Sequence, residues 1–129
     1  MAWILIADDD DLVRALWTES LTQAGYRTIQ ARSGREAIEL IRTVVPDLVI
    51  LDLRMPDLSG DDVLRHLQGT PILCRIPVLI ISGFLDDDQV GTDLGLNIVA
   101  RLPKPIGLSR LRALVAESLA GPTRSLPVT

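Results

Sequence analysis

Four short, nearly continuous apolar segments, each ending at a polar residue or a proline, constrain the fold of this chain most strongly. They are Trp3–Ala7, Asp47–Leu51, Pro77–Ile81 and Ile98–Leu102. Segments of this kind are typical of parallel strands that are buried on both faces of a sheet. A fifth segment, Tyr26–Ala31, is less apolar and alternates weakly, and we interpret it as a further strand.

Between these segments the apolar residues recur with the period of a helix. The first such face is predicted to contain Val13, Leu16, Trp17, Ser20, Leu21 and Ala24, and the second follows Ser33, a predicted N-cap. A third helix follows Asp57–Gly60, and the last and most regular one spans Leu108–Leu119. A fourth, around Asp86–Leu94, contains Gly91 and is predicted to be short and weakly stable. The order (βα)5 with right-handed crossovers predicts an α/β three-layer sandwich around a parallel sheet.

Length and composition exclude several classes of protein. The 129 residues correspond to one domain, and a single cysteine and a single histidine exclude a disulfide framework and a His-rich metal site. No apolar run exceeds seven residues, against about 18 for a membrane span, and no basic region precedes the first. We therefore expect a cytoplasmic protein without membrane contact. The net charge of −4 and 3% aromatic content disfavour direct nucleic-acid binding.

Polar residues cluster where the predicted strands end, which is where open α/β sheets place their active sites. They are Asp8–Asp11, Asp52, Ser82–Gly83 and Lys104. Clustered carboxylates repel one another unless a cation compensates them, and oxygen ligands of this kind suit Mg²⁺. A carboxylate beside Mg²⁺ and a lysine can accept a phosphoryl group. Each residue also has an ordinary alternative: an aspartate as a helix cap, the serine in a turn, the lysine in a solvated loop.

The segments ILIADDD, VILDLRMPDLSG, VLIISG and LPKPI, taken in order, resemble the four signatures of the response-regulator receiver domain of two-component signalling. The resemblance covers about residues 3–120. It implies a flavodoxin-like fold with strand order 2-1-3-4-5. We therefore expect a receiver domain over residues 1–120, and a disordered tail or the start of a linker over residues 121–129.

The resemblance also implies roles for individual residues. Asp52 would accept a phosphoryl group from the histidine of a partner histidine kinase or phosphotransfer protein. Ser82 and Lys104 would contact the phosphoryl oxygens, and the Lys104–Pro105 bond is expected to be cis. Mg²⁺, or Mn²⁺ in its place, would be bound by Asp8, Asp9, Asp52 and the backbone carbonyl of Arg54. No enzyme activity is expected beyond self-phosphorylation and slow self-dephosphorylation at Asp52.

The signalling surface implied by the resemblance comprises the fourth helix, the fifth strand and the last helix, where receivers form homodimers or meet partners. Arg101 occupies the position at which the family usually has an aromatic switch, so that mechanism does not transfer. Arg101 is either an exposed strand residue or the partner of a carboxylate. Phe84 and Arg54 occupy positions that, in the resembled family, flank the approach of water to the phosphorylated aspartate, so the resemblance implies that they set the lifetime of the phosphoryl group. The sequence does not specify the downstream target.

Two other functions remain open at this stage. One is a receiver-like interaction module that signals without phosphorylation. The other is a phosphohydrolase with an aspartate nucleophile, of the haloacid dehalogenase type. That family has a second aspartate two residues after the nucleophile, where this chain has Arg54, so we rank the phosphohydrolase low.

Overall fold

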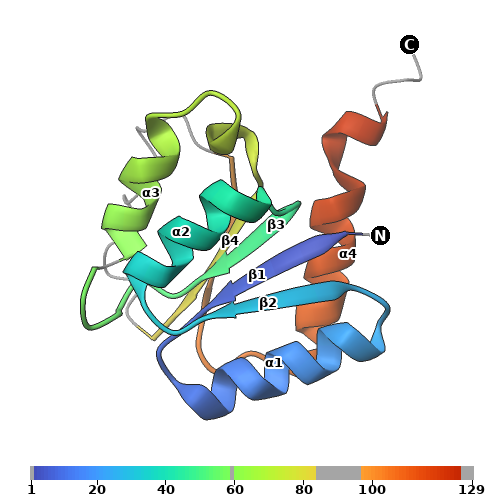
Figure 1. The fold of residues 1–129 in the computed structure, drawn as a ribbon. Coiled ribbons are helices and arrows are strands. Elements are labelled where there is room, and N and C mark those ends of the chain that lie inside the picture. The colour runs from blue at the N-terminus through green and yellow to red at the C-terminus, as the bar shows by residue number, and fades with distance from the viewer. Residues whose placement is uncertain (1, 59, 84–96, 126–129) are drawn as a thin grey trace.

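A five-stranded parallel sheet forms the centre of the molecule (Figure 1). The computed structural model describes residues 2–58, 60–83 and 97–125. The order across the sheet is β2-β1-β3-β4-β5, which confirms the predicted topology. The strands are β1 (Trp3–Ala7), β2 (Arg27–Ala31), β3 (Leu48–Leu51), β4 (Val78–Ser82) and β5 (Ile98–Pro103).

Helices cover both faces of the sheet and make the three predicted layers. Side chains of α1 and α4 pack with one face of the sheet, and side chains of α2 and α3 pack with the other. The helix predicted around Asp86–Leu94 lies in residues 84–96, outside the described part of the chain. The described helices are α1 (Asp11–Gln23), α2 (Gly34–Val44), α3 (Gly60–Gln68), the short 3₁₀ helix η1 (Leu73–Arg75) and α4 (Leu108–Ser125).

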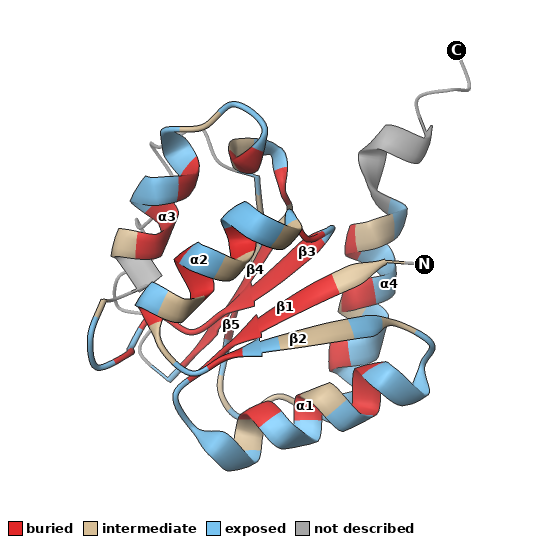
Figure 2. Cartoon of the chain, in the orientation of Figure 1, coloured by how far each residue is buried: buried red, intermediate tan, exposed pale blue. Residues whose placement is uncertain are grey.

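Three of the four strands that were predicted from nearly continuous apolar runs are the most deeply buried, whereas the fourth, β5, lies at an edge of the sheet and is mostly half-buried or exposed. β3 and β4 are buried along their whole length, and β1 is buried from its second residue onward (Figure 2). β2 lies at an edge and is mostly half-buried or exposed. Full burial of one aliphatic side chain contributes about 1.5–3 kcal/mol. The central strands therefore form a rigid base for the loops that follow them.

Side-chain caps fix where the first two helices begin. Asp10 accepts hydrogen bonds from the backbone N–H groups of Leu12 and Val13 at 3.0 and 3.2 Å, so Asp10 is the cap of α1. Ser33 caps α2 by accepting from the N–H of Glu36 at 3.2 Å, as predicted. After α1 the chain turns at Gly25, whose φ of +100° favours glycine.

Three local predictions differ from the structure. Tyr26 precedes β2, because its N–H donates to the Leu21 carbonyl at the end of α1. Leu16 and Ala24 were predicted on the buried face of α1 but are exposed, Leu16 to 44%. The backbone of α4 continues to Ser125, past the end of the last predicted helix at Leu119.

Within the described residues, no helix is both long enough and apolar enough to cross a membrane.

Candidate functional site

Four strands bring the predicted site residues to one edge of the sheet. Asp8, Asp52 and Lys104 directly follow β1, β3 and β5, and Ser82 is the last residue of β4. Backbone hydrogen bonds continue the strand pairing into these positions. The N–H of Asp52 donates to the Ala7 carbonyl at 3.0 Å, and the N–H of Lys104 donates to the Ser82 carbonyl at 3.0 Å. The pairing of the strands therefore sets the spacing of the site residues.

Three carboxylates converge at this edge. Carboxylate oxygens of Asp8, Asp9 and Asp52 lie within 4.8 Å of one another. Asp8 is fully buried and Asp52 is only 3% exposed, whereas Asp9 is exposed. Hard oxygen donors with one side open to solvent suit Mg²⁺, which binds one or two protein carboxylates and keeps several waters. The donor set therefore fits the predicted metal ion.

Lys104 is the cation of this carboxylate cluster. Its Nζ lies 2.7 Å from Asp8 Oδ2 and 3.2 Å from Asp52 Oδ2. The side chain is 23% exposed, and its Nζ lies 6.0 Å from the centroid of the buried Trp17 ring. With all four side chains ionised, three carboxylates face one ammonium, so the cluster has a net charge of −2. A divalent cation would neutralise it.

The pKa values of two cluster residues reflect burial and pairing. Burial raises the pKa of Asp8, and repulsion by Asp52 adds to this rise, against the opposing effects of Lys104 and the Asp10 N–H. Desolvation lowers the pKa of Lys104, but its hydrogen bonds and charge interactions with Asp8 and Asp52 outweigh this effect and raise it overall. The ammonium therefore stays charged, while the buried Asp8 carboxylate is ionised at a cost.

Backbone donors orient two of the carboxylates. The N–H of Asp10 donates to Asp8 Oδ1 at 2.9 Å, and the N–H of Arg54 donates to Asp52 Oδ1 at 3.2 Å. Asp52 therefore has one oxygen held by the turn after β3 and the other by Lys104. The Arg54 carbonyl, the remaining predicted metal ligand, belongs to the same turn.

The other predicted residues occupy different positions. Ser82 is fully buried, and Arg54 is exposed. Arg101 lies on β5 opposite Ile80 and is half-buried. Phe84 lies outside the described residues. The Lys104–Pro105 peptide bond is cis, as expected from the resemblance.

Sequence reasoning missed Arg14, a buried residue of α1 beneath the cluster. Its Nη1 donates to the backbone carbonyl of Asp8 at 2.7 Å. The sequence spacing indicated that Arg14 would be buried. It precedes the buried Trp17 and Leu21 by three and seven residues and so lies on the same face of the helix. The polar character of arginine hid this periodicity.

Hydrogen bonds that the sequence did not reveal join the loop after β3 to the start of α2. Asp57 accepts hydrogen bonds from the N–H groups of Gly34 and Arg35 at 2.9 and 3.0 Å. A Cβ atom at Gly34 would lie 2.4 Å from the Leu58 carbonyl oxygen. Only glycine fits this close approach without a shift, so the loop that begins at Asp52 is held against the start of α2.

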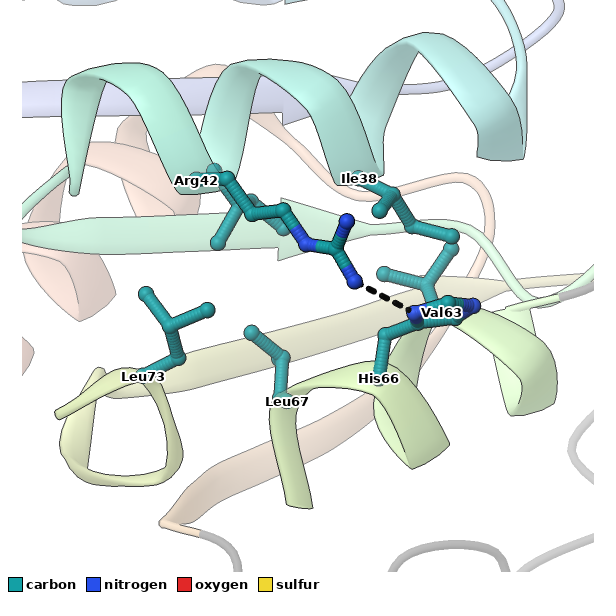
Figure 3. A pocket seen from close by; sticks show the side chains of 7 residues that line it. Ile38, Arg42, Val63, His66, Leu67 and Leu73 are labelled. Atoms are coloured by element: carbon teal, nitrogen blue, oxygen red, sulfur yellow. Dashed lines mark hydrogen bonds between the residues drawn. The ribbon is translucent and has the colours of Figure 1, made fainter. Parts of the chain in front are cut away.

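A shallow hollow with no room for a water molecule lies away from the carboxylate cluster, between α2, α3 and η1 (Figure 3). Five of its lining side chains are apolar, and the others are Arg42 and His66. Arg42 Nη2 donates to His66 Nδ1 at 3.2 Å across the gap. This hydrogen bond connects α2 to α3, and the lining contains no carboxylate.

The strand order and the lysine-paired carboxylates at the ends of β1 and β3 define a class of α/β domain, the CheY-like fold. Residues 4–116 match the family model described as the response regulator receiver domain. The chain belongs to this family of two-component signalling proteins.

Individual relatives agree with this assignment. The chain is 40% identical over 116 residues to the response regulator MprA of Mycolicibacterium vanbaalenii, which covers 87% of this chain. It spans about half of that regulator's length (49%). It is 33% identical over 108 residues to the polar-differentiation response regulator DivK of Brucella ovis, covering 83% of this chain and 87% of DivK.

A solved structure extends the likeness to three dimensions. The signal receiver domain of a signal transduction histidine kinase from Syntrophus aciditrophicus superposes with a TM-score of 0.84 at 31% identity. The superposition covers 96% of this chain and 94% of that domain.

Proposed function

We propose that this chain is a phosphoacceptor receiver and that Asp52 is its phosphorylation site. The observation that carries the proposal is the position of Asp52. Its buried carboxylate directly follows β3 and lies within a cluster of two further carboxylates and one lysine. The donor is a phosphohistidine of a partner histidine kinase or phosphotransfer protein.

The reaction transfers one phosphoryl group between two side chains. A carboxylate oxygen of Asp52 forms a bond to phosphorus as the bond between phosphorus and the donor's imidazole nitrogen breaks. The imidazole leaves with the bonding electron pair and then takes a proton from water. Such transfer requires in-line positioning and stabilisation of charge on the phosphoryl oxygens more than covalent help from the protein.

The residues around Asp52 provide that stabilisation. Lys104 Nζ, 3.2 Å from Asp52 Oδ2, pairs with a phosphoryl oxygen, and the hydroxyl of Ser82 donates to another. Asp8, Asp9, Asp52 and the Arg54 carbonyl would hold Mg²⁺, or Mn²⁺, which would supply further positive charge. Removal of the charged nucleophile should therefore abolish the reaction, whereas removal of a distant carboxylate should not.

The test is incubation with acetyl phosphate and Mg²⁺, followed by intact mass measurement. The parent chain should gain one phosphoryl group, Asp52→Asn should gain none, and the control Asp62→Asn, on α3 with a side chain 42% exposed, should behave as the parent. Steady release of phosphate without an accumulating adduct would favour a phosphohydrolase. No reaction with acetyl phosphate or with a phosphorylated kinase domain would favour an interaction module that works without phosphorylation.

The output of the domain belongs to the same proposal. The receiver spans residues 1–120 and signals through a surface to which β5 and α4 contribute, where a homodimer or a downstream partner docks; residues 86–94, predicted to complete this surface, lie outside the described part of the chain. Ser82 contacts the phosphoryl group and so connects it to the segment that follows β4. Slow hydrolysis is part of the proposal: the Arg54 guanidinium pairs with the phosphoryl charge, and the predicted contribution of Phe84 falls on a residue outside the described part of the chain. The proposed location is the cytoplasm.

A further inference from the structure

Arg14 is the buried cation of α1, with only 7% of its surface exposed. Charged side chains are rarely buried unless they are paired. The guanidinium has three partners in three segments. Nη1 donates to the Asp8 carbonyl at 2.7 Å, Nε to Gln30 Oε1 on β2 at 3.0 Å, and Nη2 to Asp11 Oδ1 at 2.5 Å.

The carbonyl that Arg14 contacts belongs to the peptide unit between Asp8 and Asp9. A peptide unit is planar, so fixing the direction of its carbonyl also fixes the bond that leads to the Cα of Asp9. The Asp8 N–H is held by the Ala31 carbonyl at 3.1 Å, and Asp8 Oδ1 by the Asp10 N–H at 2.9 Å. Arg14 thus completes the restraint of the backbone that carries two of the three clustered carboxylates.

We infer that Arg14 is a positioning residue for the metal site, acting through the Asp8–Asp9 peptide rather than by touching the ion. This inference rests on the proposed function, because it assumes that Asp8 and Asp9 bind Mg²⁺. A planar guanidinium suits three acceptors in different directions, whereas the compact ammonium of lysine cannot reproduce that fixed geometry. Loss of a residue that orients metal ligands typically weakens metal binding 10–100-fold.

The first experiment compares Arg14→Lys with the matched control Arg112→Lys. Arg112 Nη1 donates to Ser20 Oγ at 2.7 Å near the other end of α1, so the control alters an arginine contact of the same helix far from the carboxylates. The melting temperature of each protein is measured by circular dichroism over a range of Mg²⁺ concentrations, without phosphodonor. The dissociation constant for Mg²⁺ should rise about tenfold or more in Arg14→Lys and stay within about twofold in the control.

A second measurement separates positioning from general stability. The initial rate of phosphorylation by acetyl phosphate is recorded against Mg²⁺ concentration at a temperature where every variant is folded. Arg14→Lys should shift the half-saturating Mg²⁺ concentration upward, and saturating Mg²⁺ should restore most of the maximal rate. A purely structural arginine would lower stability without moving the half-saturating concentration.

The outcomes distinguish this inference from the proposed function. If the parent binds Mg²⁺ and Arg14→Lys binds it equally well, the positioning role is overturned while the proposed function stands. If the parent shows no Mg²⁺-dependent rise in melting temperature, the metal site fails, and the role of Arg14 fails with it.

Discussion

Replacement of Lys104 by methionine tests the electrostatics of the carboxylate cluster. Methionine keeps most of the aliphatic stem and removes the charge. At an effective dielectric constant of 20, the ammonium attracts Asp8 at 2.7 Å by about 6 kcal/mol and Asp52 at 3.2 Å by about 5 kcal/mol. Desolvation of the three groups offsets much of this attraction, and removing one partner of a buried pair typically costs about 3–5 kcal/mol.

Protonation of Asp8 limits how much free energy of unfolding the Lys104→Met variant can lose. Without Lys104, Asp8 can fold in its protonated form, and one pKa unit corresponds to about 1.36 kcal/mol. From the unperturbed pKa of 3.8, holding this proton costs about 4.4 kcal/mol at pH 7 and about 1.6 kcal/mol at pH 5. The folded variant binds a proton that its unfolded chain lacks, so its stability falls as pH rises. We expect Lys104→Met to lower the free energy of unfolding by about 3–4 kcal/mol at pH 7 and by about 1 kcal/mol at pH 5.

Urea unfolding followed by circular dichroism in EDTA at both pH values measures this difference. The control is Arg65→Met, which removes the cation of an exposed ion pair with Asp62, 3.4 Å apart with side chains 65% and 42% exposed. Arg65→Met should lower the free energy of unfolding by less than about 1 kcal/mol at either pH. An equal loss at pH 5 and pH 7 for Lys104→Met would refute the reasoning, because it would show that the cluster does not respond by taking up a proton.

Three further predictions concern the metal and the loop after β3. Millimolar Mg²⁺ should stabilise the unphosphorylated parent by about 1–3 kcal/mol, and Asp9→Ala should reduce this gain in thermal unfolding. Gly34→Ala should destabilise the fold by about 1–2 kcal/mol in urea, because the clash with Leu58 outweighs the better helix propensity of alanine; unchanged stability would contradict the close approach. Desolvation raises the pKa of Asp57, but backbone N–H donors lower it overall. Its stabilising contribution should therefore be complete above pH 3.8 and disappear as pH falls through the lower folded pKa, a dependence that Asp57→Asn should remove.

Features of the fold and the site were predictable where the pattern lies in neighbouring residues, and they were missed where they depend on contacts between distant segments. The central strands were predictable because burial on both faces leaves continuous apolar runs, and the position of Asp52 at the end of β3 was predictable because it directly follows one of these runs. Arg14 and Asp57 were missed because their roles depend on acceptors or donors that only the folded chain brings near, such as Gln30 for Arg14 and the N–H of Gly34 for Asp57. The exposure of Leu16 depends in the same way on how α1 is rotated against the sheet.

The position of Trp17 gives the molecule a built-in optical reporter. The chain has two tryptophans, and they lie near opposite ends of β1. Trp3 begins the strand beside Arg27, roughly 16 Å of extended chain from Asp8. The buried Trp17 ring has the Lys104 ammonium 6.0 Å from its centroid. In a Trp3→Phe protein, emission would come from this single indole, and any displacement of the ammonium toward a phosphoryl group would change the electric field at the ring. The chain could then be followed spectroscopically through phosphorylation without an attached dye.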